Sequence, residues 1–102
     1  MTGWIEACRL ADIPENQPFG ATVNGQPVCI VRRGARCYAF EDMCTHELAR
    51  LSKGWLQGDV IECPLHEAKF DITTGKALCP PAEGDLATYE ARIEGERVLV
   101  RL

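Results

Sequence analysis

Hydrophobic and charged residues alternate along the C-terminal part of the chain. From Tyr89 to Glu94 every second residue is apolar and the others are charged, and Gly95-Glu96 then leads into a second apolar run, 98–102. A period of two places one set of side chains on a buried face of a β-strand and the other set in solvent. The pattern therefore predicts a β-hairpin over 88–102.

Short apolar segments separated by turn residues fill the first part of the chain. Asn24-Gly25 lies between two of them and is the strongest hairpin signal, because both central residues of such a turn must accept a positive φ. Turns are also predicted at 12–16 and at Arg33-Gly34, and no window shows a helical stripe of useful length. The fold class is therefore predicted to be all-β, with small antiparallel sheets. The strands predicted in this part are 4–8, 19–23, 28–31 and 37–40.

The segment 42–81 differs from the rest because its apolar runs are short and most of the unusual chemistry is found there. It has too few apolar residues to bury a core of its own. We therefore expect one domain, 1–102, in which binding loops at about 42–81 are inserted into a β framework made by 1–41 and 82–102.

Composition limits the classes of function. The chain has 102 residues, of which 46% are hydrophobic and 25% charged, which is typical of one globular domain. The net charge of −4 argues against a nucleic-acid surface. The N-terminal residues include charges and a proline where a signal peptide needs an apolar stretch, and no run approaches the roughly 18 apolar residues of a membrane span. We expect a soluble, cytoplasmic monomer.

Two short motifs carry the candidate chemistry. The first is C-T-H at 44–46 and the second is C-P-L-H at 63–66, and both histidines of the chain fall inside them. Each motif offers one thiolate and one imidazole at loop spacing. A 2Fe–2S cluster in which two cysteines bind one iron and two histidines bind the other needs this arrangement. The predicted ligands are Cys44, His46, Cys63 and His66.

Other interpretations of these cysteines and histidines are weaker. A structural zinc site usually keeps like ligands together, whereas here the order alternates Cys, His, Cys, His. A nucleophilic Cys/His dyad needs one activated thiol, and it does not explain two such pairs. A disulfide scaffold is disfavoured because the six cysteines are unevenly spaced and no secretory signal precedes them.

Around these motifs the chain resembles the Rieske-type ferredoxins that serve bacterial aromatic-ring dioxygenases. The resemblance runs from WIEACRLADIPE through CTHELARLSKGWLQGDVIECPLHEAKFDITTGKALCPP to YEARIEGERVLV. It implies a Rieske fold, with three small antiparallel sheets and one 2Fe–2S cluster near one tip. It also implies a carrier that catalyses nothing by itself and takes electrons from an NADH-dependent flavin reductase to a terminal oxygenase.

The resemblance also gives an expectation for the reduction potential. High-potential relatives have an extra cysteine in each loop, where this chain has Ala49 and Leu65, and they offer a serine and a tyrosine hydroxyl to the cluster, where this chain has Ala68 and Phe70. Each missing donor leaves the reduced state less stabilised. We therefore expect a potential near the low end of the Rieske band, roughly −150 to +300 mV.

The surroundings of the ligands give further expectations. We expect His46 and His66 to form the tip that docks partners, bordered by apolar neighbours. For Trp55 we favour core packing over a place at this tip, and Pro80-Pro81 is either a loop that covers the cluster or a rigid surface turn. The apolar neighbours that could surround the tip are Leu48, Leu65, Trp55, Pro80 and Pro81.

The chain departs from many members of the family at Glu47, where they have glycine, and at Ala68-Lys69, where they have Gly-Arg. Glu47 either disfavours reduction or is a solvated surface charge. Cys29 and Cys37 are expected to be small buried hydrophobic residues. Cys79 could approach the cluster but is not a predicted ligand.

A second function class remains, a small Rieske subunit fixed in a reductase such as assimilatory nitrite reductase. The intact four-ligand motif counts against it, because such subunits often lack ligands. A third class, a zinc-stabilised interaction module, predicts a colourless protein. The sequence offers no recognisable substrate pocket, mononuclear iron site or nucleotide-binding glycine loop.

Overall fold

The chain forms short antiparallel strands, as the period of two predicts. The structure is a computed structural model that describes residues 3–43, 49–64, 68–79 and 84–102. All the pairings between its strands are antiparallel, which confirms the all-β class. The elements are β1 (Trp4–Arg9), the 3-10 helix η1 (Leu10–Asp12), β2 (Pro18–Val23), β3 (Gln26–Arg33), β4 (Arg36–Glu41), the 3-10 helix η2 (Leu51–Lys53), β5 (Trp55–Gln57), β6 (Val60–Glu62), β7 (Lys69–Asp71), β8 (Ala77–Cys79), β9 (Thr88–Glu94) and β10 (Arg97–Arg101).

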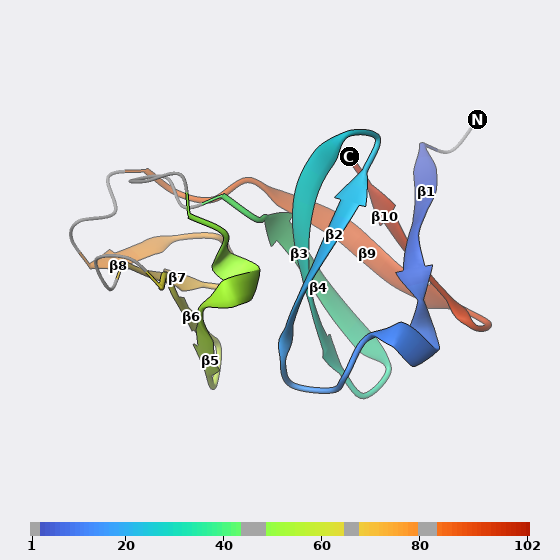
Figure 1. The fold of residues 1–102 in the computed structure, drawn as a ribbon, viewed down its shortest axis with the longest axis horizontal. Coiled ribbons are helices and arrows are strands. Elements are labelled where there is room, and N and C mark those ends of the chain that lie inside the picture. Colours follow the sequence, from blue (N-terminus) through green and yellow to red (C-terminus); the bar gives the residue numbers. More distant parts are fainter. Residues whose placement is uncertain (1–2, 44–48, 65–67, 80–83) are drawn as a thin grey trace.

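Six of the strands form a framework sheet in the order β1-β10-β9-β4-β3-β2 (Figure 1). Asn24 and Gly25 have φ values of 50° and 79°, so both central residues of the β2–β3 turn take the left-handed conformation that their sequence predicts. The turn between β9 and β10 likewise falls at Gly95-Glu96. Each predicted strand of the framework lies within two residues of its observed bounds.

The expectation of three separate sheets needs a correction. Two of them are joined, because β4 pairs with β9 through Ala39↔Tyr89 and Phe40↔Thr88. β9 lies between the two strands, pairing with β10 along Glu90 to Glu94 and with β4 through Thr88 and Tyr89. The described residues therefore form one six-stranded and one four-stranded sheet.

The smaller sheet has the order β5-β6-β7-β8, and each of its strands has three residues. Its inner face shares one hydrophobic cluster with framework residues Cys29, Val31 and Phe40, all fully buried. Figure 1 shows this sheet beside the framework, along the 38 Å long axis of the molecule. The bounds of the predicted cluster-binding subdomain, 42–81, stay a prediction.

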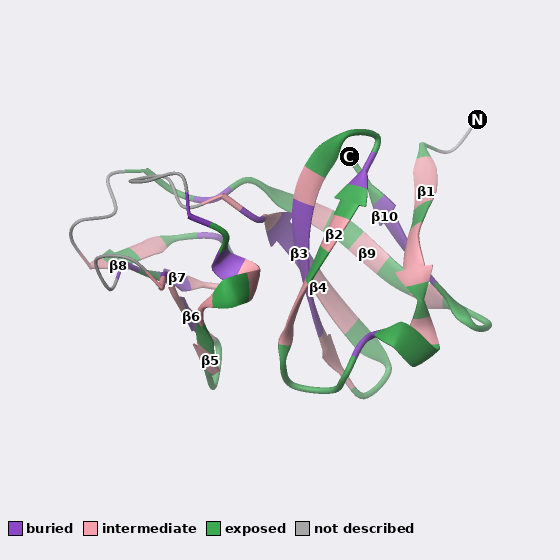
Figure 2. Cartoon of the chain, viewed as in Figure 1, coloured by how far each residue is buried: buried purple, intermediate pink, exposed green. Residues whose placement is uncertain are grey.

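A second cluster forms the core of the framework itself. It gathers fully buried residues of β3 and β10, among them Val28, Ile30, Val98 and Val100. Figure 2 shows this buried stretch along β3 and β10, with exposed residues at η1 and the turns. Among the described residues no helix is long and apolar enough to cross a membrane.

One side-chain contact ties the small sheet to the framework, and a second set of contacts joins β4 to the residue before β9. The Arg33 guanidinium donates to the Gly58 carbonyl and pairs with the Asp59 carboxylate, both in the β5–β6 turn. On the other side, Glu41 and Ala87 exchange two hydrogen bonds, with the Ala87 N–H donating to the Glu41 carboxylate at 3.0 Å and the Glu41 N–H to the Ala87 carbonyl at 2.9 Å. Arg33 of β3 therefore holds the β5–β6 turn against the framework, and Glu41 of β4 holds the residue just before β9.

Candidate metal centre

One of the four predicted ligands, Cys63, lies among the described residues. It directly follows β6 and is fully buried. Its N–H donates to the Ala68 carbonyl at 2.8 Å, which continues the pairing between β6 and β7. The second predicted binding segment, 64–67, therefore begins and ends on one antiparallel hairpin. The other predicted ligands, Glu47 and the neighbours expected at the tip apart from Trp55 lie outside the described residues: Cys44, His46, His66, Glu47, Leu48, Leu65, Pro80 and Pro81.

The two ends of the first predicted binding segment also lie side by side. Met43 and Arg50 form an antiparallel β-bridge, and the Leu51 N–H donates to the Asp42 carbonyl at 2.8 Å. The Asp42 side chain is buried and accepts hydrogen bonds from Ser52. Sequence reasoning did not single out Asp42, because it directly follows Glu41 and nothing in the sequence marks it as the buried member of this acidic pair.

The bases of the two segments meet at one end of the small sheet. Ala49, Cys63 and Ala68 belong to the same buried cluster. At the end of η2, a Cβ on Gly54 would lie 1.9 Å from the Glu62 carbonyl oxygen, so the backbone there packs directly on the residue before Cys63. A buried thiol beside the bases of two segments that offer a further thiol and two imidazoles fits a metal centre with mixed sulfur and nitrogen ligands.

The residues that replace hydroxyl donors lie beside Cys63. Ala68 and Phe70 are fully buried and share its hydrophobic cluster. Neither side chain can donate a hydrogen bond. The described wall of the site is therefore apolar at these two positions. Ala49, where high-potential relatives have a cysteine, is buried as well.

The expectation that Trp55 packs in the core is wrong. Its side chain is 60% exposed on the outer face of the small sheet. The reason is the alternation within β5, since Leu56 faces inward toward the cluster and its neighbours must face outward. Trp55 pairs with Glu62, so it lies close to Cys63 in the sheet and at the same end as the candidate centre.

Among the described residues, the cysteines form no disulfide. Cys29 is fully buried, as expected, and burial raises the pKa of its thiol well above the ordinary value. Cys37 is only half-buried, which corrects the expectation for it, because it lies at the end of β4 beside the exposed Arg36. Burial, followed by the neighbouring Cys37, raises the pKa of Cys8 to about 11. Cys79 ends β8 opposite Lys69, at the same end of the sheet as Cys63.

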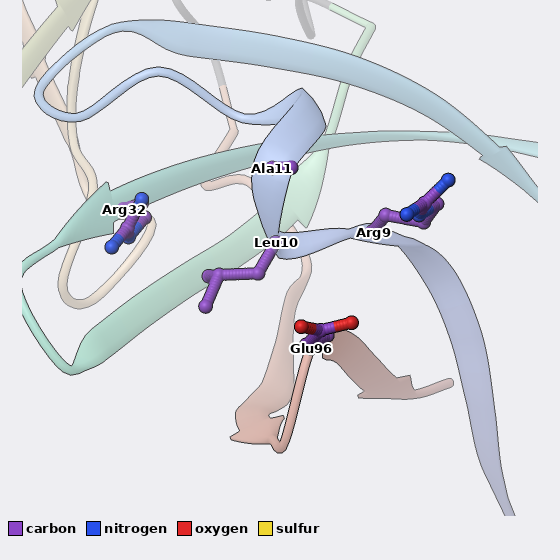
Figure 3. A pocket seen from close by; sticks show the side chains of 5 residues that line it. All are labelled: Arg9, Leu10, Ala11, Arg32 and Glu96. Atoms are coloured by element: carbon purple, nitrogen blue, oxygen red, sulfur yellow. The ribbon is translucent and has the colours of Figure 1, made fainter.

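A shallow pocket of about 320 Å³ lies at the framework end remote from the small sheet. Figure 3 shows Arg9 and Arg32 on either side of Leu10, with Glu96 below. The Leu10 N–H donates to the Glu96 carbonyl at 2.8 Å, which ties η1 to the β9–β10 turn. Among the described residues no three His, Cys, Asp or Glu side chains gather as a metal site, so this pocket offers no alternative metal centre.

The amino-acid sequence matches a known domain family and is similar to characterised proteins over nearly its whole length. The family model described as "Rieske [2Fe-2S] domain" matches residues 3–90. The ferredoxin component of the naphthalene 1,2-dioxygenase/salicylate 5-hydroxylase systems of Ralstonia sp. is 46% identical over 99 residues, which cover 97% of this chain and 95% of that protein.

Solved structures agree with the family match. The ferredoxin of carbazole 1,9a-dioxygenase from Nocardioides aromaticivorans IC177 superposes with a TM-score of 0.89 at 30% identity, covering 96% of each chain. A chain from the complex of reduced oxygenase and oxidized ferredoxin in carbazole 1,9a-dioxygenase superposes with a TM-score of 0.86 at 34% identity, covering 99% of this chain and 94% of that one.

Proposed function

Because the chain belongs to the Rieske [2Fe–2S] domain family, we propose that it is the ferredoxin component of an aromatic-ring dioxygenase system. The family match means that the chain carries one Rieske-type 2Fe–2S cluster. The observation that supports the proposal most is the 46% identity to such a ferredoxin component over nearly the full length of both chains. We further propose that the protein is soluble, cytoplasmic and monomeric.

The ligands of this cluster are Cys44, His46, Cys63 and His66 in our proposal. Support comes from the buried position of Cys63 and from the bases of the two binding segments, which meet beside it. The chemistry that such a cluster supplies is the uptake and release of one electron. The apolar side chains around Cys63 keep water from the thiol that binds the metal. In this proposal His46 and His66 supply the two imidazole ligands.

The proposed partners are an NADH-dependent flavin reductase, which donates the electron, and a terminal oxygenase, which accepts it. A relative solved in a complex of oxygenase and ferredoxin supports the second partner. The test is reconstitution of electron flow from NADH through a reductase and this protein to a terminal oxygenase. We expect the rate of product formation to rise with the concentration of this protein. Flow to a nitrite reductase, with none to any dioxygenase, would contradict the proposal and favour the reductase-subunit alternative.

We propose a reduction potential near the low end of the Rieske band. The fully buried Ala68 and Phe70 offer no hydroxyl beside Cys63, and donors to the sulfur atoms are what stabilise the added negative charge. Protein-film voltammetry measures this potential directly. A value above about +150 mV, far up the band of roughly −150 to +300 mV, would contradict the low-potential assignment.

A further inference from the structure

Asp42 is the one charged or polar side chain that is fully buried in the described parts of the chain. A buried carboxylate is costly unless hydrogen bonds replace its hydration. It directly follows β4 and precedes the segment that holds the first motif. The hydrogen bonds of its side chain therefore have to offset the cost of burying the carboxylate.

The carboxylate of Asp42 reaches across the base of the segment 43–51. One oxygen accepts a hydrogen bond from the Ser52 N–H at 2.6 Å, and the other accepts one from the Ser52 hydroxyl at 2.7 Å. Arg50 approaches the second oxygen at 3.7 Å from the exposed side. We call Asp42, Arg50 and Ser52 the clamp.

The framework makes room for the clamp at Gly20 in β2. A Cβ at this position would lie 2.6 Å from the Ser52 hydroxyl and 3.1 Å from the second carboxylate oxygen of Asp42. Because Gly20 has no side chain, Ser52 can sit against β2 while it bonds Asp42. The backbone N–H of Asp42 in turn donates to the Pro27 carbonyl at 3.1 Å, which fixes the clamp to β3.

We propose that Asp42 is a positioning residue for the cluster. The clamp fixes both ends of the segment that carries the proposed ligands Cys44 and His46, and so it sets how these ligands meet the fixed Cys63. The proposal rests on the proposed function, since it concerns the ligands of the same cluster. Residues that orient metal ligands from outside typically change metal retention about 10- to 100-fold when they are replaced.

The chain contains a matched control for the clamp. Asp71 accepts hydrogen bonds from the Thr73 N–H at 2.8 Å and the Thr73 hydroxyl at 2.6 Å, the same pair of donor types that Ser52 offers. This turn follows β7, and Asp71 pairs with Val60 at the end of the sheet away from Cys63. Asp71→Ala therefore removes equivalent hydrogen bonds without touching the base of a binding segment.

The experiment measures the half-life of the visible absorbance of the purified holoprotein in the presence of an iron chelator. We expect Asp42→Ala to shorten the half-life about tenfold or more. Ser52→Ala and Gly20→Ala break the clamp more mildly and are expected to shorten it severalfold. Asp42→Asn should stay within about twofold of the wild type, because an amide can still accept from the Ser52 N–H and donate to its hydroxyl. Asp71→Ala should match the wild type.

A second readout separates positioning from loss of folding. Far-UV circular dichroism of each variant should keep the β spectrum of the wild type, while the electron paramagnetic resonance signal of reduced Asp42→Ala should have shifted g values that Asp42→Asn restores. Half-lives of Asp42→Ala, Ser52→Ala and Gly20→Ala all within twofold of the wild type would overturn the proposal. If the wild-type protein contained no iron and sulfide, the proposed function itself would be wrong. A wild type that holds its cluster beside unaffected clamp variants would overturn only the role of Asp42, so the two failures can be told apart.

Discussion

The two predicted binding segments leave the fold from bases that are held in different ways. The base at Cys63 is closed by backbone pairing, because its N–H donates to the Ala68 carbonyl within the β6–β7 hairpin. Across the base at Asp42 the described residues form one β-bridge and one backbone hydrogen bond, and a buried side chain completes the contact. Backbone pairing survives most substitutions, whereas a side-chain contact is lost with one. The second base therefore depends on the packing of its hairpin, and the first depends on particular side chains.

The largest effect is expected from a substitution that removes the packing of the β6–β7 hairpin. Phe70 in β7 is fully buried in the cluster that contains Cys63, so Phe70→Ala should lower the free energy of unfolding by about 3–5 kcal/mol. Urea unfolding followed by circular dichroism measures it. The adjacent, exposed Lys69 is the control, and Lys69→Ala should change the free energy by no more than about 0.5 kcal/mol. A loss below about 1 kcal/mol for Phe70→Ala would show that the hairpin does not depend on this core.

The next effect concerns the backbone contact between Gly54, directly after η2, and the residue before Cys63. A Cβ at Gly54 would lie 1.9 Å from the Glu62 carbonyl oxygen, and backbone atoms cannot give way cheaply. Gly54→Ala should therefore lower the free energy of unfolding by about 2–3 kcal/mol and speed loss of the cluster to a chelator.

Gly58→Ala is the comparison for this variant. A Cβ at Gly58 would meet no atom of the described residues within 4 Å, and only the φ of +59° opposes a side chain there. The substitution should cost about 1 kcal/mol and leave the cluster half-life unchanged. Equal cluster loss in the two variants would mean that the backbone contact at Gly54 does not help to retain the cluster.

A smaller effect is expected where the small sheet is tied to the framework. Arg33 binds the β5–β6 turn through Gly58 and Asp59, but the pair is partly exposed, so Arg33→Ala should cost only about 1 kcal/mol. Amide hydrogen exchange should nevertheless accelerate at 58–60 while the β2–β3 hairpin keeps its protection. Uniform acceleration over both sheets would contradict a local role for this contact.

The smallest effect is a shift in the titration of Asp71. Hydrogen bonds from the Thr73 hydroxyl and N–H lower the pKa of its carboxyl below the ordinary 3.8. A pKa that is lowered in the folded state adds stability above the unfolded value, and this stability is lost as the pH falls through the folded pKa. Between pH 6 and pH 4 the ¹³C shift of the Asp71 carboxyl should therefore move less in the wild type than in Thr73→Val. Identical curves would show that Thr73 does not stabilise the charged form.

The same contrast explains what could be predicted from the sequence. The framework strands and their turns are predicted well because β9 shows a clear period of two, the other framework strands are apolar segments bounded by turn residues, and Asn24-Gly25 and Gly95 mark the turns. The three-residue strands of the small sheet are too short to show a period. For this reason hydrophobicity alone predicts a core position for Trp55, although the alternation around Leu56 places it outside.

The clamp could not be predicted for a different reason. Asp42 and Ser52 lie on opposite sides of a binding segment, and their burial depends on Gly20 in another strand. Sequence spacing contains no sign of such a tertiary contact. The candidate ligands, in contrast, could be proposed at once, because the alternating order of Cys and His is a local feature.

The most direct test of the ligand assignment is pulsed electron paramagnetic resonance on reduced protein labelled with ¹⁵N in histidine alone. The chain has two histidines, so every labelled coupling must come from His46 or His66. We expect couplings from two nitrogen atoms bound directly to the cluster, with one lost in each single histidine variant that keeps its cluster. A signal without directly bound histidine nitrogen, or a protein that contains zinc and no iron, would contradict the assignment.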